Sequence, residues 1–427
     1  SPPHMLSVGE LLETAHEISK LTIAHEIVLD RDFKLQAVTF APNSLENRVK
    51  ETLHRAFWDR LEEQLSASPP DYTQAIQLLQ EIKETLLSLL LPRHNRLRGE
   101  IEAALDVELL RQEAEHGALD VGSVAARVLG TMAALCAPVR DEDVRALRSL
   151  TDPAQLLREI FRVLDLMKMD MLNFTIQSLR PHLREHSVQY ERKKFQELLD
   201  KLPNSLDHTT EWLREAAVAM GPSAAPAHPA APGAVPSPTA VLNRAYMNLL
   251  CWEPAHGQYP ETLFMDQARL QAVRSQVNQL VIIAAVLLVT GGMCGSTLFG
   301  SPGFVARLKR VTKVLLEGLP CTRYEEALRD VGDQVLQEVC RALSQLGCPA
   351  FGKDKCASLK GQISSIADKD NAVRRVVEQR IHSFLSLFIS PNGQNSLKDL
   401  PKGLDAIQEE LLDVGRRFGS VIHHNRQ

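Results

Sequence analysis

The sequence predicts an all-α fold, either a multi-helix bundle or stacked helical layers, with several long helices. Apolar residues recur at spacings of three and four over long segments, which is the period of a helix with one buried face. The alternation of apolar and polar residues that marks strands is nearly missing. Apolar residues make up 44% and charged residues 24% of the 427 positions, a composition typical of a globular chain with a sizeable core.

The first well-bounded helix follows the break at Ser68-Pro69-Pro70-Asp71. Asp71 is a capping residue, and Gln74 follows it by three positions, as in a capping box. Apolar residues then repeat at helical spacing from Ile76 to Leu90, and Pro92 marks the expected end.

The longest helix is expected from Pro153 to Arg180. Asp152 can cap its start, and a proline fits the first helical position. Because Pro181 disfavours helical backbone in the residue before it, we expect this helix to stop at Arg180. At 1.5 Å per residue it would be roughly 42 Å long, a length that suits a bundle.

Further helices are expected throughout the chain, and Asp30–Phe40 is expected to be an extended connector. Their predicted ranges are Leu45–Leu65, Ile101–His116, Val188–Leu202, Leu206–Ala217, Asp266–Val289, Phe304–Glu317, Arg323–Leu346, Ala372–Ile389 and Gly403–Phe418.

An uncharged stretch from Ser275 to Ala306 contains the apolar run Leu280–Val289, and glycines follow it. It could be a membrane span, a phosphate-binding turn or a buried core helix. A span needs roughly 20 apolar residues, and a nucleotide loop needs a lysine directly after its glycines, whereas the first lysine here is Lys309. A core helix that ends at the glycines is therefore favoured. The residues expected to be buried in it are Val281, Ile282, Ile283, Val286, Leu287 and Val289.

Proline and alanine dominate residues 220–238, where repeated prolines block helix and small residues offer little to bury. We interpret this segment as a disordered linker or long loop. It would separate an N-terminal helical region (1–219) from a C-terminal helical region (239–427), although one helical body interrupted by a loop remains the alternative.

No catalytic residues, metal ligands or cofactor are predicted. His182 and His186 share a helical face, but nothing at motif spacing supplies the further ligands that zinc needs. The seven cysteines include no Cys-x-x-Cys pair, so we expect reduced thiols. No serine-hydrolase motif is present, and the net charge of −5 argues against nucleic acid as a partner.

Two basic clusters are candidates for binding a protein partner or an anionic membrane surface. One lies in a connector, and the other recurs every three residues on an amphipathic helix. Ordinary solvated faces are the alternative reading. The candidate residues are Arg93, Arg96 and Arg98 in the first cluster and Arg307, Arg310 and Lys313 in the second.

The chain has no secretory signal pattern and no convincing transmembrane helix, so a cytoplasmic location is expected. Because it begins without an initiator methionine and ends within a helical pattern, we also expect it to be a piece of a longer protein.

Several motifs together resemble the T-complex protein 11 family. They extend over most of the chain and comprise residues Ala56–Asp59, Leu89–Pro92, Asn95–Arg98, Gln112–Leu119, Leu135–Glu142, Leu166–Met171, Gln177–Leu183, Tyr190–Glu197, Pro260–Leu263 and Leu298–Pro302. The resemblance implies a non-enzymatic helical protein linked to cAMP signalling, sperm capacitation and the acrosome reaction. It also implies a location in the flagellum or acrosomal region, and supplies no catalytic residues.

From the residues and the resemblance we expect a helical scaffold or adaptor that binds protein partners in cAMP-linked signalling or in the sperm flagellum. The alternative is a peripheral membrane receptor for a fertilisation-promoting peptide, in which case a peptide ligand and membrane contact would be needed.

Overall fold

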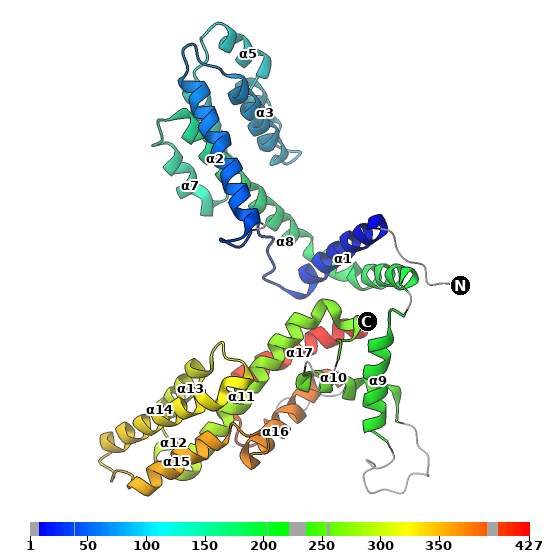
Figure 1. Cartoon of the computed structure of the whole chain (residues 1–427), viewed down its shortest axis with the longest axis vertical. Coiled ribbons are helices and arrows are strands. Elements are labelled where there is room, and N and C mark those ends of the chain that lie inside the picture. Colours follow the sequence, from blue (N-terminus) through cyan, green and yellow to red (C-terminus); the bar gives the residue numbers. More distant parts are fainter. Residues whose placement is uncertain (1–7, 38, 203, 222–235, 254–256, 391–399) are drawn as a thin grey trace. The chain divides into compact units, whose positions relative to one another are not determined.

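A computed structural model describes residues 8–37, 39–202, 204–221, 236–253, 257–390 and 400–427 (Figure 1). Every regular element in these ranges is a helix, which confirms the predicted all-α class. Contacts divide the chain into two compact units. Unit 2 is residues 26–185, and unit 1 is residues 1–25 together with 186–427.

Two helices run from one unit into the other. Helix α1 (Val8–Leu29) has all but its last four residues in unit 1. Helix α8 (Pro153–Lys201) begins in unit 2 and ends in unit 1. The boundaries between the units therefore fall within α1 and α8, and not at residues 220–238.

Most of the expected linker, residues 222–235, lies outside the described residues. On its two sides α9 (Asp207–Ala219) and α10 (Pro238–Asn248) pack against each other within unit 1. The Trp212 indole N–H donates to the carbonyl oxygen of Ala245 at 3.0 Å, and the Trp212 and Tyr246 rings meet edge to face. The composition break and the structural division thus lie at different places.

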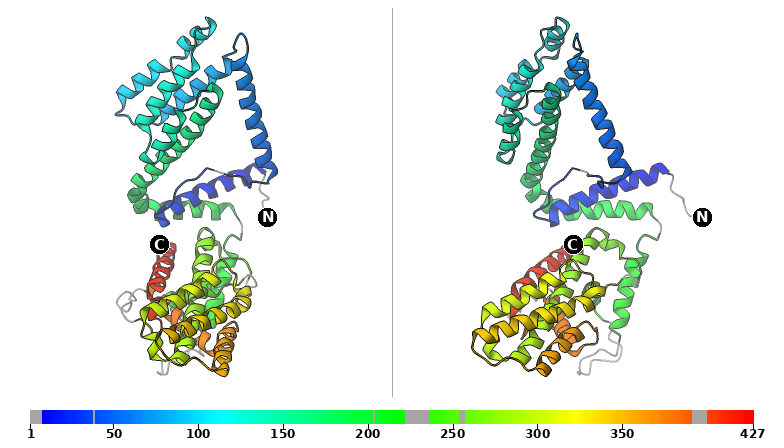
Figure 2. Two further views of the ribbon diagram at one scale, coloured as in Figure 1. Left: turned by 90° about the vertical axis from the view of Figure 1, so that its left-hand side faces the viewer. Right: turned by 60° about the vertical axis from the view of Figure 1, so that its left-hand side comes forward.

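Unit 2 is built from several helices around the first part of α8. They are α2 (Leu45–Ser66), α3 (Thr73–Ser88), α4 (Asn95–Ala104), α5 (Val107–Glu115), α6 (Val121–Leu135), the 3-10 turn η1 (Pro138–Arg140) and α7 (Asp141–Leu147). Their apolar faces share one core with α8, in which Leu157 and Ile160 are fully buried. Helix α2 joins this core through Trp58 and Leu61, near its C-terminal end. Both views of Figure 2 show its first half standing off from the other helices of unit 2.

Unit 1 is organised around α11 (Gln267–Cys294), which contacts several later helices of the unit (Figure 1). Its other elements are η3 (Leu249–Cys251), η5 (Glu261–Asp266), α12 (Ser296–Phe299), α13 (Pro302–Leu316), η6 (Cys321–Arg323), α14 (Tyr324–Gln345), α15 (Lys353–Ser365), α16 (Ala372–Ile389), η8 (Asp405–Ile407) and α17 (Gln408–Arg426). Helices α13, α15, α16 and α17 all contact α11. Because α11 is enclosed by these neighbours, it buries residues on all of its faces rather than along one stripe.

The helix expected to stop at Arg180 instead continues through Pro181 to Lys201, for 49 residues in all. A proline removes one backbone donor and costs about 3 kcal/mol inside a helix. The buried Arg180 holds the preceding turn, since it donates to Gln177 Oε1 at 3.3 Å and to the carbonyl oxygen of Arg31.

Other predicted boundaries were also wrong. The segment expected as a separate helix, Val188–Leu202, is the last part of α8, and the helix expected over Gly403–Phe418 is α17, which runs from Gln408 to Arg426. The helix expected over 101–116 is two helices, because the Asp106 carboxylate accepts the backbone N–H groups of Glu108 and Leu109 and starts α5 afresh. Gly291 and Gly292 do not end α11, which runs on to Cys294. The helix ends where Gly295 takes φ +69°, a left-handed conformation that suits glycine.

Candidate functional site

The basic residues singled out from the sequence fall in two different units, and each cluster is described by itself. Arg93 is exposed in the turn before α4 in unit 2, Arg98 is exposed on α4, and Arg96 Nε binds Glu100 Oε1 at 2.9 Å. In unit 1, Arg307 Nε lies 3.4 Å from Glu338 Oε2 in a salt bridge.

Within α13, Arg310 and Lys313 are the two members of the second cluster that are fully exposed. Since Arg307 is engaged with Glu338, the cationic face expected on this helix is reduced to two residues. Such a face has little of the charge that membrane association needs.

The six residues expected to be buried in the apolar run lie in the middle of α11. Val281, Ile282, Ile283, Val286, Leu287 and Val289 are at most 8% exposed. By length and composition, one helical stretch among the described residues, Glu261–Cys294, could cross a membrane, but 61% of its apolar window is buried inside the protein. Burial of this kind is typical of a core helix.

Sequence reasoning missed a cavity in unit 1. Its volume is about 610 Å³, and it lies among α1, the end of α8, η5 and the end of α17. Much of its wall is apolar and includes Ile18, Leu21, Val188, Phe195, Leu198 and Leu202. Several ionisable residues also line it, and four of them lie together as one polar group: His25, Glu191, Asp266 and His424.

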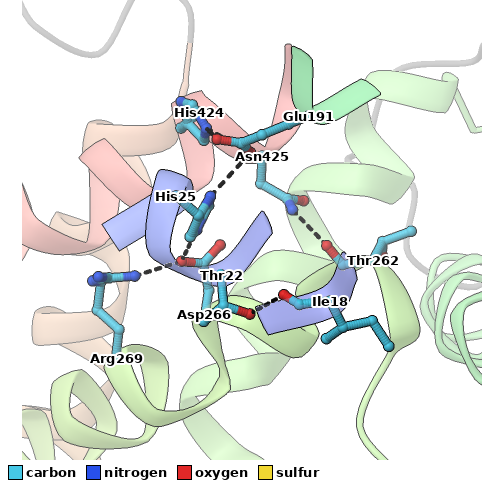
Figure 3. Close-up of polar contacts among 9 residues, drawn as sticks. All are labelled: Ile18, Thr22, His25, Glu191, Thr262, Asp266, Arg269, His424 and Asn425. Carbon is cyan, nitrogen blue, oxygen red and sulfur yellow. Dashed lines mark hydrogen bonds and ion pairs between the residues drawn. The ribbon is translucent and has the colours of Figure 1, made fainter. Parts of the chain in front are cut away.

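His25, on α1, lies at the centre of this polar group (Figure 3). Its Nε2 is 2.7 Å from Asp266 Oδ1, and its Nδ1 is 3.0 Å from Glu191 Oε2. The side chain is only 2% exposed. Asp266 Oδ1 also accepts a hydrogen bond from Arg269 Nη1 at 2.7 Å, so this carboxylate is held from two sides.

His424, in the last turn of α17, approaches the same carboxylate as His25. Its Nε2 lies 3.1 Å and 3.0 Å from the two oxygens of Glu191, and the two imidazole rings meet edge to face, 5.2 Å between centroids. Glu191 is therefore shared between two histidines (Figure 3).

Neighbouring contacts fix the end of α17. Asn425 Nδ2 donates to the Thr262 carbonyl at 2.8 Å, and the Tyr246 hydroxyl donates to Asn425 Oδ1 at 2.7 Å. The Arg426 guanidinium lies over the Tyr246 ring, 5.2 Å from its centroid, and its Nη1 donates to the Ile389 carbonyl at 2.6 Å. The position of His424 is thus set by η5, α10 and α16.

Electrostatics tie His25 and Glu191 into an ion pair. Burial by itself would lower the pKa of His25, but the hydrogen bonds and charges of Asp266 and Glu191 outweigh it and raise that pKa to about 9. Burial would likewise raise the pKa of Glu191, but the hydrogen bonds from His25 and His424 lower it to about 2. With both ring nitrogens against carboxylates, His25 is the imidazolium at neutral pH and donates from each nitrogen.

Among the residues that the structure describes, two groups have atoms close enough to share a metal ion: His25, Glu191 and His424, and separately Cys251, Glu378 and His382. In each group the ligand atoms lie within 4.8 Å of one another. The first group is buried or half-buried, whereas Cys251 in the second is exposed. His182 and His186, which the sequence did not favour as metal ligands, both lie exposed on α8, and all seven cysteines are free.

The sequence contains no local signal for the polar group. His25 is 166 residues from Glu191, and Glu191 is 233 residues from His424. Motifs for metal or acid–base sites depend on short spacings, and here the fold alone brings the residues together.

A second candidate site lies on α2 in unit 2. Leu45, Val49, Leu53 and Phe57 are 71%, 49%, 67% and 37% exposed, and we call these four residues the α2 stripe. Their spacing of four places them on one side of the helix. Leu45, Val49 and Leu53 line a shallow hollow together with Glu46, Lys50 and His54. An exposed apolar face of this size is typical of an interaction surface.

A family model described as T-complex protein 11 matches residues 23–427. The T-complex protein 11 homolog of Homo sapiens is 52% identical, with all of this chain and 87% of the human protein covered. The T-complex protein 11-like X-linked protein 1 of Homo sapiens is 48% identical, over 98% of this chain and 86% of that protein. T-complex protein 11 of Mus musculus is 47% identical, over 98% of this chain and 74% of the mouse protein.

No solved structure is significantly similar to this chain. The family model and the full-length relatives agree with each other and with the motifs found along the sequence. The chain belongs to the T-complex protein 11 family.

Proposed function

We propose that this protein is a non-enzymatic helical adaptor that binds an amphipathic helix of a protein partner along the α2 stripe. Its setting would be cAMP-linked signalling in sperm, including capacitation and the acrosome reaction, with a place in the flagellum or acrosomal region. The family resemblance supports that setting, and the α2 stripe is the observation that supports binding.

The α2 stripe has the dimensions of a helix-binding surface. From Leu45 to Phe57 it extends for about 18 Å at 1.5 Å per residue, which is more than three turns. Side chains spaced by four residues along one helix can pack into the grooves between the side chains of a second helix that lies beside it. Arg48 and Lys50 are exposed on either side of Val49, and Glu46 is exposed in the same hollow as Lys50. The partner helix should therefore carry acidic residues opposite the two cations and a basic residue opposite Glu46.

A matched pair of substitutions tests this proposal. Val49 belongs to the α2 stripe, whereas Val139 is exposed elsewhere in unit 2, 68% by area. Tagged wild type, Val49→Asp and Val139→Asp would each be cross-linked in sperm extract, and cross-linked peptides identified by mass spectrometry. We expect cross-links from α2 to a helical, acidic segment of a cAMP-signalling protein in wild type and Val139→Asp, and their loss in Val49→Asp.

Three results would overturn the adaptor proposal. One is an identical set of cross-links in all three proteins. Another is cross-linking of α2 only to a second copy of the same chain, which sedimentation velocity would detect as a concentration-dependent dimer. The third is a cross-linked set without any protein of cAMP signalling, which would remove the proposed setting while leaving the surface.

The second candidate function is a peripheral membrane receptor for a peptide, and the cavity in unit 1 is the observation that favours it. A volume of about 610 Å³ with apolar walls and a polar group could take a short peptide segment. Membrane contact would then depend on α13. Flotation with anionic vesicles at low salt tests it, comparing wild type with Arg310→Glu. We expect neither protein to float, and flotation of wild type alone would favour the receptor.

A further inference from the structure

We propose that His25, Glu191 and His424 bind a divalent transition-metal ion, with Zn²⁺ the best match. The ligand atoms would be His25 Nδ1, a Glu191 carboxylate oxygen and His424 Nε2. This site goes beyond the adaptor function and does not depend on it.

The distances fit a single small ion. Two ligands bound tetrahedrally at about 2.0–2.1 Å are roughly 3.3 Å apart. Glu191 Oε2 is 3.0 Å from His25 Nδ1 and 3.0 Å from His424 Nε2, and the three ligand atoms all lie within 4.8 Å of one another. To hold the ion, the two 3.0 Å contacts of Glu191 would open by a few tenths of an ångström, and the two imidazole nitrogens would come to about 3.3 Å from each other.

The contacts around His25 already hold its imidazole in an orientation suited to binding a metal ion. Asp266 Oδ1 lies 2.7 Å from His25 Nε2, and Arg269 holds Asp266 in turn. A carboxylate on the far nitrogen of a histidine fixes the ring orientation and leaves the other nitrogen facing the metal. Here that other nitrogen, Nδ1, already faces Glu191.

The ligand types select the metal class. Two imidazoles and one carboxylate suit Zn²⁺ and its transition-metal neighbours, whereas Ca²⁺ and Mg²⁺ prefer oxygen ligands alone. Three protein ligands leave a fourth position, and all three residues line the cavity, so a water or a ligand held in the cavity could complete the site.

Without metal, the Nδ1 proton of His25 occupies the space between the two side chains. Metal binding displaces this proton to solvent, and the imidazole lone pair then forms the bond to the ion. The ion would join α1, the end of α8 and α17, so it should stabilise unit 1 against unfolding.

The experiment uses the full chain, freed of metal with a chelator and titrated with Zn²⁺ by calorimetry. The variant Glu191→Gln removes the central ligand while keeping a hydrogen-bonding side chain. Asp266→Asn keeps all three ligands but weakens the support of His25. The control is the double variant Cys251→Ser, His382→Gln, which removes two ligand atoms from the other residue group near enough to hold a metal.

We expect one Zn²⁺ per chain in wild type and in the control. Affinity should fall at least 100-fold in Glu191→Gln and about 10–100-fold in Asp266→Asn. Co²⁺ added to wild type should give the visible absorption bands of a tetrahedral ion, and Zn²⁺ should remove them. If Glu191→Gln does not fold, His424→Gln replaces it, because His424 lies in the last turn of α17.

The site is refuted if wild type and the ligand variants bind Zn²⁺ equally, if binding is lost only in the control, or if wild type binds none. An absorption spectrum of octahedral Co²⁺ would also overturn it, because that coordination indicates a solvent-exposed oxygen site.

Discussion

Helices α11 and α2 have similar lengths but opposite surroundings. Helix α11 is enclosed by other helices of unit 1, and Val286 at its centre is fully buried. Helix α2 buries Trp58 and Leu61 near one end and leaves Val49 exposed near the other. The same kind of apolar side chain therefore supports folding in α11 and is exposed in α2.

The largest effect should come from placing a charge in α11. In Val286→Asp a carboxylate would be buried among apolar side chains without a partner, which should cost about 3–5 kcal/mol in the free energy of unfolding of unit 1. Urea denaturation followed by circular dichroism measures this loss. A loss below about 1 kcal/mol would mean that α11 is not enclosed as described.

The burial of α11 could be predicted from the sequence. Its apolar run contains no charged residue and is too short to span a membrane, so the interior of the protein is the environment that favours it. The exposure of the α2 stripe could not. A helical stripe of apolar residues is typical of a face that meets another helix, but the pattern does not say whether that helix belongs to the same chain.

Contacts between residues far apart in the sequence could not be predicted either. The contacts of His25 with Glu191 and Asp266 join segments 166 and 241 residues apart. Local rules failed in a different way at Pro181, where the helix continues despite the proline. Tertiary contacts determine both the grouping around His25 and the continuation of α8 through Pro181, and they cannot be read directly from a single sequence.

The closeness of packing around α11 can be tested where α16 and α17 cross. A Cβ at Gly415 would lie 2.4 Å from Phe388 Cε2, so Gly415→Ala must displace the ring. We expect a loss of about 1–3 kcal/mol in the free energy of unfolding. In the control Gly361→Ala, on α15, an added Cβ meets nothing within 4 Å, and higher helix propensity should stabilise by about 0.5–1 kcal/mol. Equal effects of the two substitutions on the free energy of unfolding would indicate that α16 and α17 are loosely packed where they cross.

A smaller effect is expected at the start of α9. Its own N-cap residue supplies no side-chain bond, but Glu261 accepts the backbone N–H groups of His208 and Thr209 at 3.0 Å and 2.7 Å. Glu261→Gln keeps an oxygen acceptor and removes the charge that complements the helix dipole. We expect a loss of about 0.3–1 kcal/mol at pH 7 in chemical denaturation.

The pH dependence of this loss follows from the pKa of Glu261. Burial would raise that pKa, but the hydrogen bonds from His208 and Thr209 lower it below its ordinary value of 4.5. A carboxyl with a lowered folded-state pKa stabilises above its ordinary pKa and loses this contribution as pH falls through the folded value. The difference between wild type and Glu261→Gln should therefore be full at pH 7 and shrink below pH 4.5. If the stability difference between wild type and Glu261→Gln grew as the pH fell, the charge of Glu261 would not be its cause.

The smallest effect on stability should come from the substitution that most sharply tests the comparison, Val49→Asp in the α2 stripe. It makes the same change as Val286→Asp, but Val49 is 49% exposed, so the new carboxylate stays hydrated. We expect the free energy of unfolding to change by less than about 0.5 kcal/mol, in the same urea experiment. Partner binding should nevertheless be lost, because docking a helix on the stripe would bury that carboxylate among apolar groups. A large loss of stability would mean that the stripe packs within the chain and is not a surface kept open for a partner.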